Sequence, residues 1–389
     1  MKIKINWSGK AHNYNKKEKK YLLNVLDSDT FTQGKEKENF ERELRKYLKR
    51  ENVFCTSSAA SSLELIAALL EIKKGDEIIV PAHTYCASAI PFARNGAKII
   101  WSDINLKTRT IDLEDVKKKI TKKTKAIVIV HLYGYGVDVN QFIKLNKNIK
   151  IIEDCAQSFG AELNGKKIGT FGDFSCFSFH AQKNITTLGE GGAIYVRNNL
   201  LSKKVPGLRH NGHSNYSKNR KFYWKPAMGN LDLDLANHWP YKFTLSEIQC
   251  AAGYLMLNKV DYLNNIRIKR AKKFINKFEG NHLSFNGAFN QKRHVYHLLS
   301  ALVNPSKKIN NHKLINLLYQ KFRIKCAVQY YPLYRYPLFK KMKVKKQKCP
   351  NTDYFFDNMI SFPFHVWMKE KDFDYLCNSV HEAIKILTK

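Results

Sequence analysis

Five short stretches of the chain carry residues whose types could act together in one site. Lys183 stands between an apolar run and a glycine-rich turn in FSFHAQKNITTLGEGG. Asp154 ends another apolar run, in EDCAQ, where a carboxylate costs stability unless a cation lies nearby. The turn SSAASS before an apolar helix offers amides and hydroxyls to an anion, and Ser178 could bind the same anion. Tyr85 could cover a flat ring. Each signal is weak alone, so the interpretation depends on whether the fold brings the five together.

The elements around these residues predict a mainly parallel sheet. Short apolar runs, in GDEIIVPAHTY, GAKIIWSDI, KAIVIVHLYG and IKIIEDCAQ, end in polar or aromatic groups and are separated by helix-length segments. The run from Phe174 to Phe179 and the run from Ala193 to Val196 are two further predicted strands, with a glycine turn between them. Strands that alternate with helices indicate an α/β fold with right-handed crossovers, in which the polar strand ends gather at one edge.

The remainder of the chain is predicted to form helices and a second, smaller domain. Residues 15–50 have a helical pattern, with Phe40, Leu44 and Leu48 on one face. From about Leu255 the pattern changes to a long lysine-rich helix, followed by short apolar runs and a final helix, which is typical of an α+β domain. We therefore predict a large domain over residues 1–254 and a small C-terminal domain over residues 255–389.

Composition excludes several classes of protein. The 389 residues are 44% hydrophobic, which is enough for a real core, and the longest apolar stretches have only the length of a strand. The first residues lack the apolar centre of a signal peptide, so we expect a cytoplasmic protein that does not insert into a membrane. The eight cysteines form no C-x-x-C pair and the 13 histidines no metal-ligand pattern, which predicts reduced structural thiols and no metal site.

The formal charge of +34 raises the question of nucleic-acid binding. The lysines are spread over the whole chain, and no helix-turn-helix, zinc-finger or aromatic RNA-binding motif is present. A general lysine-rich composition accounts for the charge best, and attraction of an anionic substrate or surface is the alternative. A basic scaffold that only kept an enzyme fold is a further alternative, but it gives no reason to keep Asp154 and Lys183 at one sheet edge. We expect no nucleic-acid partner.

One cofactor needs all five features. Pyridoxal phosphate (PLP) needs its phosphate bound, its ring covered, its pyridinium nitrogen held protonated by a carboxylate, and its aldehyde held by a lysine as a Schiff base. A protonated ring is the electron sink that stabilises a carbanion, and the released lysine can move protons once its amine is neutral in a partly desolvated site. The constellation therefore predicts a PLP enzyme in which Lys183 and Asp154 are catalytic.

The sequence resembles the DegT/DnrJ/EryC1/StrS family of PLP-dependent sugar aminotransferases, which have the fold of fold-type I aminotransferases. The resemblance covers almost the whole chain, and its specific stretches are the one around Lys183 and EDCAQSFGA. Weaker stretches accompany them: TFTQGKEKENFERELRKYL, SSAASSLELIAALL, GDEIIVPAHTYCASAIPFARNGAKIIWSDI, HLYGYGVDV, LRHNGHS, FTLSEIQCAAGYLML and YYPLY.

The resemblance implies a role for each residue of the site. Lys183 would hold the cofactor as a Schiff base and Asp154 would face the pyridine nitrogen. Gln157 would contact the ring oxygen and Tyr85 would stack on the ring. The phosphate would be held by three further residues: Ala60, Ser61 and Ser178.

Three stretches depart from the family pattern. Family members are usually homodimers in which a segment of one subunit reaches the partner's phosphate, and here Thr244 stands in that segment where Arg or Asn is common. Ala59 and Ala60 replace a common Gly-Thr pair, so phosphate binding should depend more on backbone amides and on serine hydroxyls. An insertion over residues 215–240 is expected to form part of the sugar pocket, unless it is a surface loop without function.

The resemblance also implies the reaction. An amino acid, most often L-glutamate, would give its amino group to the cofactor, which would pass it to a keto-sugar. We expect this sugar to be nucleotide-linked and to serve the biosynthesis of amino sugars for surface polysaccharide or lipopolysaccharide. An oxidised octulosonate-type sugar acid is an alternative acceptor, because it would suit the basic charge equally. A PLP-dependent sugar dehydratase is another alternative, but relatives of that kind have histidine in place of the lysine, and Lys183 favours transamination.

Overall fold

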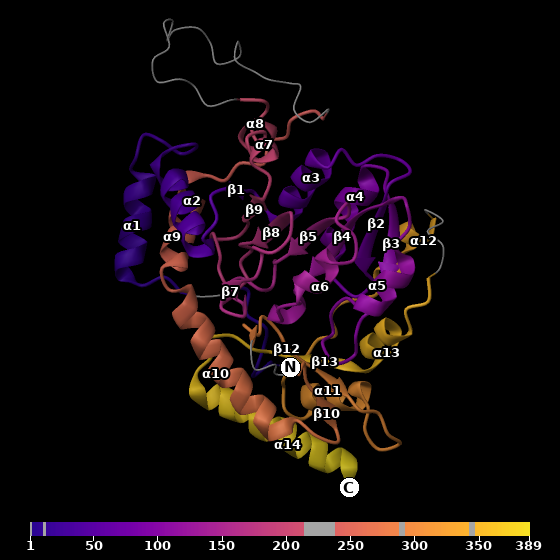
Figure 1. Ribbon diagram of the computed structural model, residues 1–389. Helices are drawn as coiled ribbons and strands as arrows, with labels where there is room; N and C mark the ends of the chain where they lie inside the picture. Colours follow the sequence, from indigo (N-terminus) through magenta and orange to yellow (C-terminus); the bar gives the residue numbers. More distant parts are fainter. Residues whose placement is uncertain (1, 11–12, 214–237, 288–291, 342–346) are drawn as a thin grey trace, which may run out of the picture.

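A computed structural model describes residues 2–10, 13–213, 238–287, 292–341 and 347–389 of the chain. The insertion predicted over residues 215–240 lies outside the described residues except for its last three positions. The helices are α1 (Lys16–Leu26), α2 (Lys35–Leu48), α3 (Ala59–Leu69), α4 (Ile90–Arg94), α5 (Leu113–Lys119), α6 (Val139–Ile143), α7 (Asn199–Ser202), α8 (Val205–Leu208), α9 (Glu247–Leu257), α10 (Val260–Phe278), α11 (Asn311–Gln320), α12 (Pro337–Lys341), α13 (Pro350–Asn358) and α14 (Glu370–Thr388) (Figure 1).

Seven strands form the central sheet, in the order β1-β9-β8-β5-β4-β2-β3. They are β1 (Val53–Thr56), β2 (Glu77–Pro81), β3 (Lys98–Ser102), β4 (Thr124–Val130), β5 (Lys150–Asp154), β8 (Phe174–Ser178) and β9 (Gly192–Val196). Strands β3, β2, β4, β5 and β8 are parallel neighbours, whereas β9 pairs antiparallel with both β8 and β1. The predicted α/β fold with a mainly parallel sheet is therefore confirmed, with β9 as the strand that runs in the opposite direction.

Alternation along the strands divides their side chains between two cores. Ile78 and Val80 of β2 pack in a core with α3 and α4, on one face of the sheet. Ile79, between them, packs in a second core with Val116 of α5 and Phe142 of α6, on the other face. Because both faces are covered by helices, the strands are apolar on both sides, which is typical of parallel sheets.

Helices α2 and α9 cover the end of the sheet that carries β1 and β9. The predicted apolar face of α2, formed by Phe40, Leu44 and Leu48, is buried and packs in one core with residues of β1, β9 and α9. The helical pattern predicted over residues 15–50 is interrupted between α1 and α2, and Gly34 is the N-cap that precedes α2. Figure 1 shows α1, α2 and α9 at this end of the molecule, where α9 contacts both α1 and α2.

The C-terminal part builds a separate core around a three-stranded sheet. Strands β10 (Leu283–Ser284), β12 (Leu299–Val303) and β13 (Met359–Phe362) pair in this order, and α10, α11 and α14 contribute the remaining core residues. Ile5 packs in this core too. The predicted boundary at residue 254 falls inside α9, and α10 continues from the central sheet toward the C-terminal core (Figure 1).

A second small sheet, β11-β6-β7, lies between these parts and consists of β6 (Glu162–Leu163), β7 (Lys166–Lys167) and β11 (Lys292–Arg293). All eight cysteines are free thiols. Among the described residues, no helix combines the length and the apolar character that crossing a membrane requires.

Candidate active site

The predicted site residues come together at the carboxyl ends of β5 and β8 and at the start of α3. Asp154 is the last residue of β5, and Ser178 is the last residue of β8. The turn Ser57–Ser58 joins β1 to α3, and Gly192, the first residue of β9, pairs with both Thr56 and Ser178. Parallel strands bring their carboxyl ends to one edge, where sites of open α/β sheets are built. The fold thus places the anion turn, Asp154 and Ser178 at one edge, as the sequence predicted.

Asp154 is buried and has two neutral hydrogen-bond donors. Its Oδ2 accepts from Ser88 Oγ at 2.7 Å, and its Oδ1 accepts from the Ala156 amide at 3.0 Å. Lys183 interacts electrostatically with this carboxylate, which supplies the cation that a buried carboxylate needs. Sequence reasoning missed Ser88, because a serine in a run of small residues gives no sign of the strand end that it will contact.

The turn before α3 is a cluster of hydroxyls around the helix N-terminus. Ser58 is the N-cap, and its Oγ accepts from the Ser61 amide at 3.0 Å. The hydroxyls of Ser57 and Ser58 each lie 2.9 Å from Ser61 Oγ. The amides of Ala59 and Ala60 have no hydrogen-bond acceptor among the described residues. Free amides and hydroxyls at a helix N-terminus fit a phosphate group, and the two alanines take no space from it.

Gly192 allows β9 to approach the start of α3. A Cβ on Gly192 would lie 2.4 Å from the carbonyl carbon of Ser58, 2.7 Å from the Ala59 amide nitrogen and 2.7 Å from the Phe177 carbonyl oxygen. These are backbone atoms, so no side chain could move aside. The glycine therefore sets the separation between the serine turn and the end of β8.

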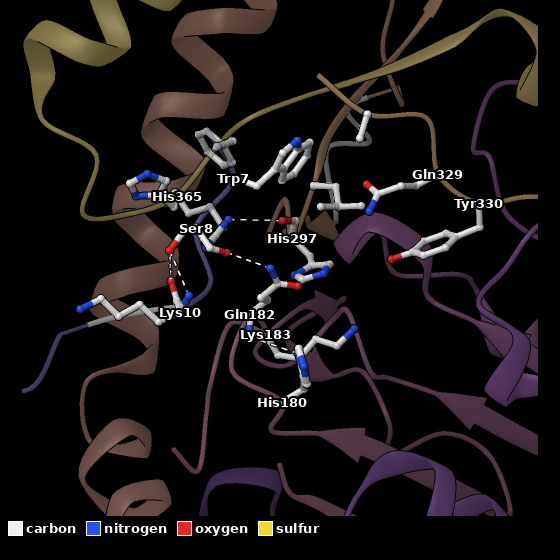
Figure 2. A pocket seen from close by; sticks show the side chains of 14 residues that line it. Trp7, Ser8, Lys10, His180, Gln182, Lys183, His297, Gln329, Tyr330 and His365 are labelled. Carbon is white, nitrogen blue, oxygen red and sulfur yellow. Dashed lines mark hydrogen bonds between the residues drawn. The ribbon is translucent and has the colours of Figure 1, made fainter. Parts of the chain in front are cut away.

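Lys183 reaches a cavity of about 190 Å³ that opens beside the sheet edge. Its own amide donates to the His180 carbonyl at 2.9 Å, which curls the loop after β8. Burial lowers the pKa of the Lys183 amine below its ordinary value, although the negative charge of Asp154 partly opposes this. Figure 2 shows the side chains of Lys183, His297 and Tyr330 converging on the same space.

Gln157 is held in place by residues that sequence reasoning did not single out. Its Oε1 accepts from the Tyr133 amide at 2.9 Å, and its Nε2 donates to Tyr330 Oη at 3.0 Å. Tyr133 is fully buried, has a φ of 60°, and its hydroxyl lies 2.7 Å from His83 Nε2. Burial raises the pKa of the Tyr330 hydroxyl, so it stays protonated. The stretch YYPLY was a weak family signal for which a place in the substrate pocket was expected, and in the structure Tyr330 lines the cavity.

Tyr85 and Thr244 lie close to the same edge. The Tyr85 side chain is 57% exposed, and its ring centroid lies 6.0 Å from that of Tyr330. Thr244 is partly buried and follows Phe243, whose carbonyl accepts from the Ser57 amide at 2.9 Å. Both residues are therefore near the turn and the cavity within one chain. Tyr85 is free on one side to cover a ring.

One buried group of possible metal ligands, His131, Glu153 and Cys155, is explained by hydrogen bonds. Glu153 accepts from the amides of Gly169, Phe171 and Gly172 and from His131 Nε2. Because His131 Nδ1 accepts from the Val137 amide, its proton is on Nε2, which donates to the carboxylate. These hydrogen bonds outweigh burial and lower the pKa of Glu153. These hydrogen bonds hold the turn after β5 together and occupy the carboxylate of Glu153 and both ring nitrogens of His131.

Comparison with known proteins agrees with this geometry. The model of the DegT/DnrJ/EryC1/StrS aminotransferase family matches residues 12–381. The chain is 31% identical to GDP-perosamine synthase from Escherichia coli O157:H7 over 372 residues, which are 94% of this chain and 95% of that protein. It is 29% identical to UDP-4-amino-4,6-dideoxy-N-acetyl-beta-L-altrosamine transaminase from Campylobacter jejuni over 374 residues, which are 95% of each chain.

Solved structures show the same likeness. Spr1654 from Streptococcus pneumoniae in its PMP form has a TM-score of 0.89 at 26% identity, and the match covers 98% of this chain and 100% of that chain. PseC from Helicobacter pylori, an aminotransferase involved in the biosynthesis of pseudoaminic acid, has a TM-score of 0.87 at 26% identity, with 98% and 99% covered. The family match spans both the sheet edge and the C-terminal core. The chain therefore belongs to the DegT/DnrJ/EryC1/StrS aminotransferase family and is a PLP-dependent sugar aminotransferase.

Proposed function

We propose that this enzyme transfers an amino group from an amino acid, with L-glutamate as the expected donor, to a nucleotide-linked keto-sugar in amino-sugar biosynthesis. The named relatives above act on GDP-linked and UDP-linked sugars, which supports the nucleotide-linked acceptor. The single observation that carries the proposal is the position of Lys183. Its side chain lines a cavity and interacts electrostatically with Asp154, as amino-group transfer on PLP requires of the lysine and the carboxylate.

The residues at the edge fit PLP in their donor and acceptor chemistry. We assign the phosphate to the Ser58–Ser61 turn, with the free amides of Ala59 and Ala60 and the hydroxyls of Ser61 and Ser178. Asp154 is assigned to the pyridine nitrogen, because its two neutral donors leave the carboxylate able to accept a further proton-bearing group. Gln157 is assigned to the ring oxygen and Tyr85 to the ring face.

The roles of the protein groups follow from their surroundings. PLP supplies an electron sink that stabilises negative charge on the carbon losing or gaining a proton. Lys183 would hold the cofactor, and its lowered pKa favours the neutral form of the released amine, which would take and return that proton. Tyr330, held by Gln157 at 3.0 Å, closes the cavity opposite Lys183 and supplies a protonated hydroxyl to the substrate (Figure 2).

The visible absorption spectrum of the purified protein, before and after L-glutamate, tests this function. We expect a band of the lysine-bound cofactor that bleaches with L-glutamate and returns when a keto-sugar nucleotide is added. Lys183→Ala should abolish multiple turnover, and Lys203→Ala should match the wild type because Lys203 is exposed at the end of α7. Multiple turnover by Lys183→Ala would refute the assignment, and a colourless protein that ignores added PLP would refute the cofactor.

We also propose that the enzyme works as a homodimer. Several large apolar side chains are exposed near the site edge, among them Tyr85 and Leu188. Segments around Thr244 and the start of α9 lie beside the same edge. A second copy of the chain placed there would cover these side chains and complete the surroundings of the cofactor. Thr244 would then contribute a hydroxyl, in place of a cation, to the contact between subunits.

A further inference from the structure

The cavity beside Lys183 has a basic lining. Among the described residues that line it, six side chains are basic: Lys10, His180, Lys183, Arg267, His297 and His365. The lining also contains the phenol of Tyr330, which burial keeps protonated and neutral. Among the residues that the structure describes, no Asp or Glu lines this space. A basic cavity attracts anions, and donors in fixed positions discriminate among them. Two of the six basic side chains, Arg267 and His297, are held in position by hydrogen bonds and can therefore discriminate among ligands.

Arg267 is a buried cation without an acidic partner among the described residues. It projects from α10, is only 4% exposed, and its Nη1 donates to the carbonyls of Tyr296 and His297, each at 3.3 Å. The Phe364 ring lies 5.2 Å from the guanidinium carbon. Burial lowers the pKa of Arg267 to about 10, so the side chain is still charged at neutral pH. Its Nε and Nη2 make no hydrogen bond within the described part of the chain, which leaves one edge of the guanidinium for a ligand.

His297 has a fixed tautomer. Asn264 Nδ2 donates to the Phe159 carbonyl, so Asn264 Oδ1 accepts from Asn184 Nδ2 at 2.8 Å. Asn184 Nδ2 also donates to the Val295 carbonyl, which leaves Asn184 Oδ1 as an acceptor 3.2 Å from His297 Nδ1. The ring proton of His297 is therefore on Nδ1, and Nε2 has a free lone pair.

The surroundings of His297 keep it neutral. Burial and the nearby charges of Lys183, Arg267 and His180 hold the pKa of the imidazole well below its ordinary value. Lys183 and Arg267 line the same cavity as this ring. In Figure 2 the His297 ring stands next to the Lys183 side chain at the wall of the cavity. The site thus combines a hydrogen-bond donor for an anion (Arg267), a neutral hydrogen-bond acceptor (His297) and the amine of Lys183.

We propose that Arg267 and His297 bind two charged groups of the amino-acid donor: Arg267 binds its α-carboxylate, and His297 Nε2 accepts a hydrogen bond from its α-ammonium beside Lys183. This inference rests on the proposed transfer from an amino acid. It follows that the 2-oxo acid product, which keeps the carboxylate but has no ammonium group, contacts only Arg267. The two residues therefore separate binding of the donor from binding of the product.

Isothermal titration of the holoenzyme with 2-oxoglutarate, and the concentration dependence of bleaching by L-glutamate, test the assignment. Arg267→Gln should weaken both ligands by roughly 10–100-fold, because a hydrogen-bonded charge pair is lost. His297→Asn keeps a donor for Asn184 but has no acceptor at the Nε2 position. It should weaken L-glutamate by about tenfold and leave 2-oxoglutarate unchanged.

Other outcomes are equally decisive. Equal weakening of both ligands in His297→Asn would overturn the role of His297, since a packing defect would act on both. Unchanged 2-oxoglutarate binding in Arg267→Gln, together with a raised KM for the sugar nucleotide, would assign Arg267 to the acceptor's phosphates. If Arg267→Gln does not fold, as judged by circular dichroism, Arg267→Lys replaces it. That variant keeps the charge but loses the planar fork, so both ligands should still weaken by roughly tenfold.

The wild type separates this inference from the proposed function. If no amino acid bleaches the wild-type protein, the proposed donor half-reaction is wrong. Titration with 2-oxoglutarate would still show whether Arg267 binds a carboxylate. If L-glutamate bleaches the wild type but Arg267→Gln and His297→Asn behave like it, the function stands and this inference is wrong.

Discussion

Asp154 depends on a neighbour that belongs to another element. Ser88 Oγ has one hydrogen, which it donates to Asp154 Oδ2 at 2.7 Å, so Thr84 Oγ1, at 3.1 Å, must be the donor to Ser88. This chain of two hydroxyls fixes the direction of the carboxylate without adding a charge. A carboxylate held in this way stays in position to keep a ring nitrogen protonated.

Replacing Ser88 by Ala should therefore change the chemistry more than substrate binding. A hydrogen bond to a charged group contributes about 1.5–3 kcal/mol, so we expect kcat to fall roughly 10–100-fold with little change in the KM for the sugar nucleotide. The pH at which the absorption band of the bound cofactor shifts should also change, which a merely structural defect would not cause. Ser88→Thr keeps the hydroxyl and should restore both values. An unchanged spectrum in Ser88→Ala would contradict the role assigned to this serine.

The lowered pKa of Lys183 predicts a pH-dependent stability. Between the lowered pKa and the ordinary value of 10.5, the unfolded chain binds more protons at this side chain than the folded protein does. The free energy of unfolding therefore rises with pH through this window. Lys183→Met lacks this contribution, so the stability of the wild type relative to the variant should increase as pH rises from 7 toward 10.

Urea unfolding of the cofactor-free protein at pH 7, 8.5 and 10 measures this difference. Lys203→Met is the matched control, because Lys203 is exposed, and its curve should stay parallel to that of the wild type. A difference between wild type and Lys183→Met that stays constant or falls with pH would show that burial does not lower the pKa of Lys183.

At the scale of elements, the close approach of β9 to the start of α3 fixes the position of the serine turn that we assign to the phosphate. Gly192→Ala would place a methyl group 2.4 Å from the carbonyl carbon of Ser58, so the strand or the helix must shift. We expect a loss of about 1–3 kcal/mol in the free energy of unfolding, together with at least tenfold weaker PLP binding. Gly189→Ala is a suitable control, because a Cβ there meets no atom within 4 Å.

Denaturant unfolding and titration of the cofactor-free protein with PLP would measure the two effects. If Gly192→Ala lost stability but bound PLP as tightly as the wild type, the turn would not be the phosphate site. Equal behaviour of Gly192→Ala and Gly189→Ala would mean that the close approach has no energetic consequence.

Much of the sheet could be predicted from the sequence, because its pattern is local. The apolar runs that end in Asp154 and Ser178 indicated strands, and the strand ends indicated the edge where they meet. The antiparallel direction of β9 was not predicted, since a run of four or five apolar residues has the same pattern in either direction. The direction depends on the connection after β8, which contains no helix and returns through the glycine turn to pair β9 beside β8.

At the scale of the whole molecule, the residues that sequence reasoning missed are those whose partners are distant in the chain. Ser88 contacts a residue 66 positions away, and His297 contacts one 113 positions away. Arg267 looked like any other cation in a lysine-rich helix, and only its burial distinguishes it. Lys183 and Asp154 could be recognised from local motifs, because a lysine or a carboxylate next to the end of a predicted strand is already unusual in the sequence itself. The walls of the cavity have no such signal, since they form only when α10 and the C-terminal core meet the sheet.

The exposed apolar side chains near the site make the strongest case for a second subunit. Phe31 is 56% exposed and Leu188 is 47% exposed. Both flank the start of α9, because the Phe31 carbonyl accepts from the Glu247 amide, and Glu190, close to Leu188, accepts through its carbonyl from Gln249. Apolar side chains grouped next to a binding site are typical of an interface between subunits. We therefore expect the wild type to sediment at twice the mass of one chain.

Phe31→Glu should weaken this dimer by roughly tenfold or more, because a charge would replace a buried aromatic side chain in the interface. Leu200→Glu provides the control, since Leu200 is 73% exposed on α7 and should tolerate the charge. Sedimentation equilibrium at several protein concentrations distinguishes the two variants. PLP titration at the same concentrations measures how tightly each variant binds the cofactor. If dissociation and loss of PLP occur together in Phe31→Glu, the partner completes the site. A monomeric Phe31→Glu that binds PLP like the wild type would show that one chain holds the cofactor alone, and that Thr244 takes no part in a neighbour's site.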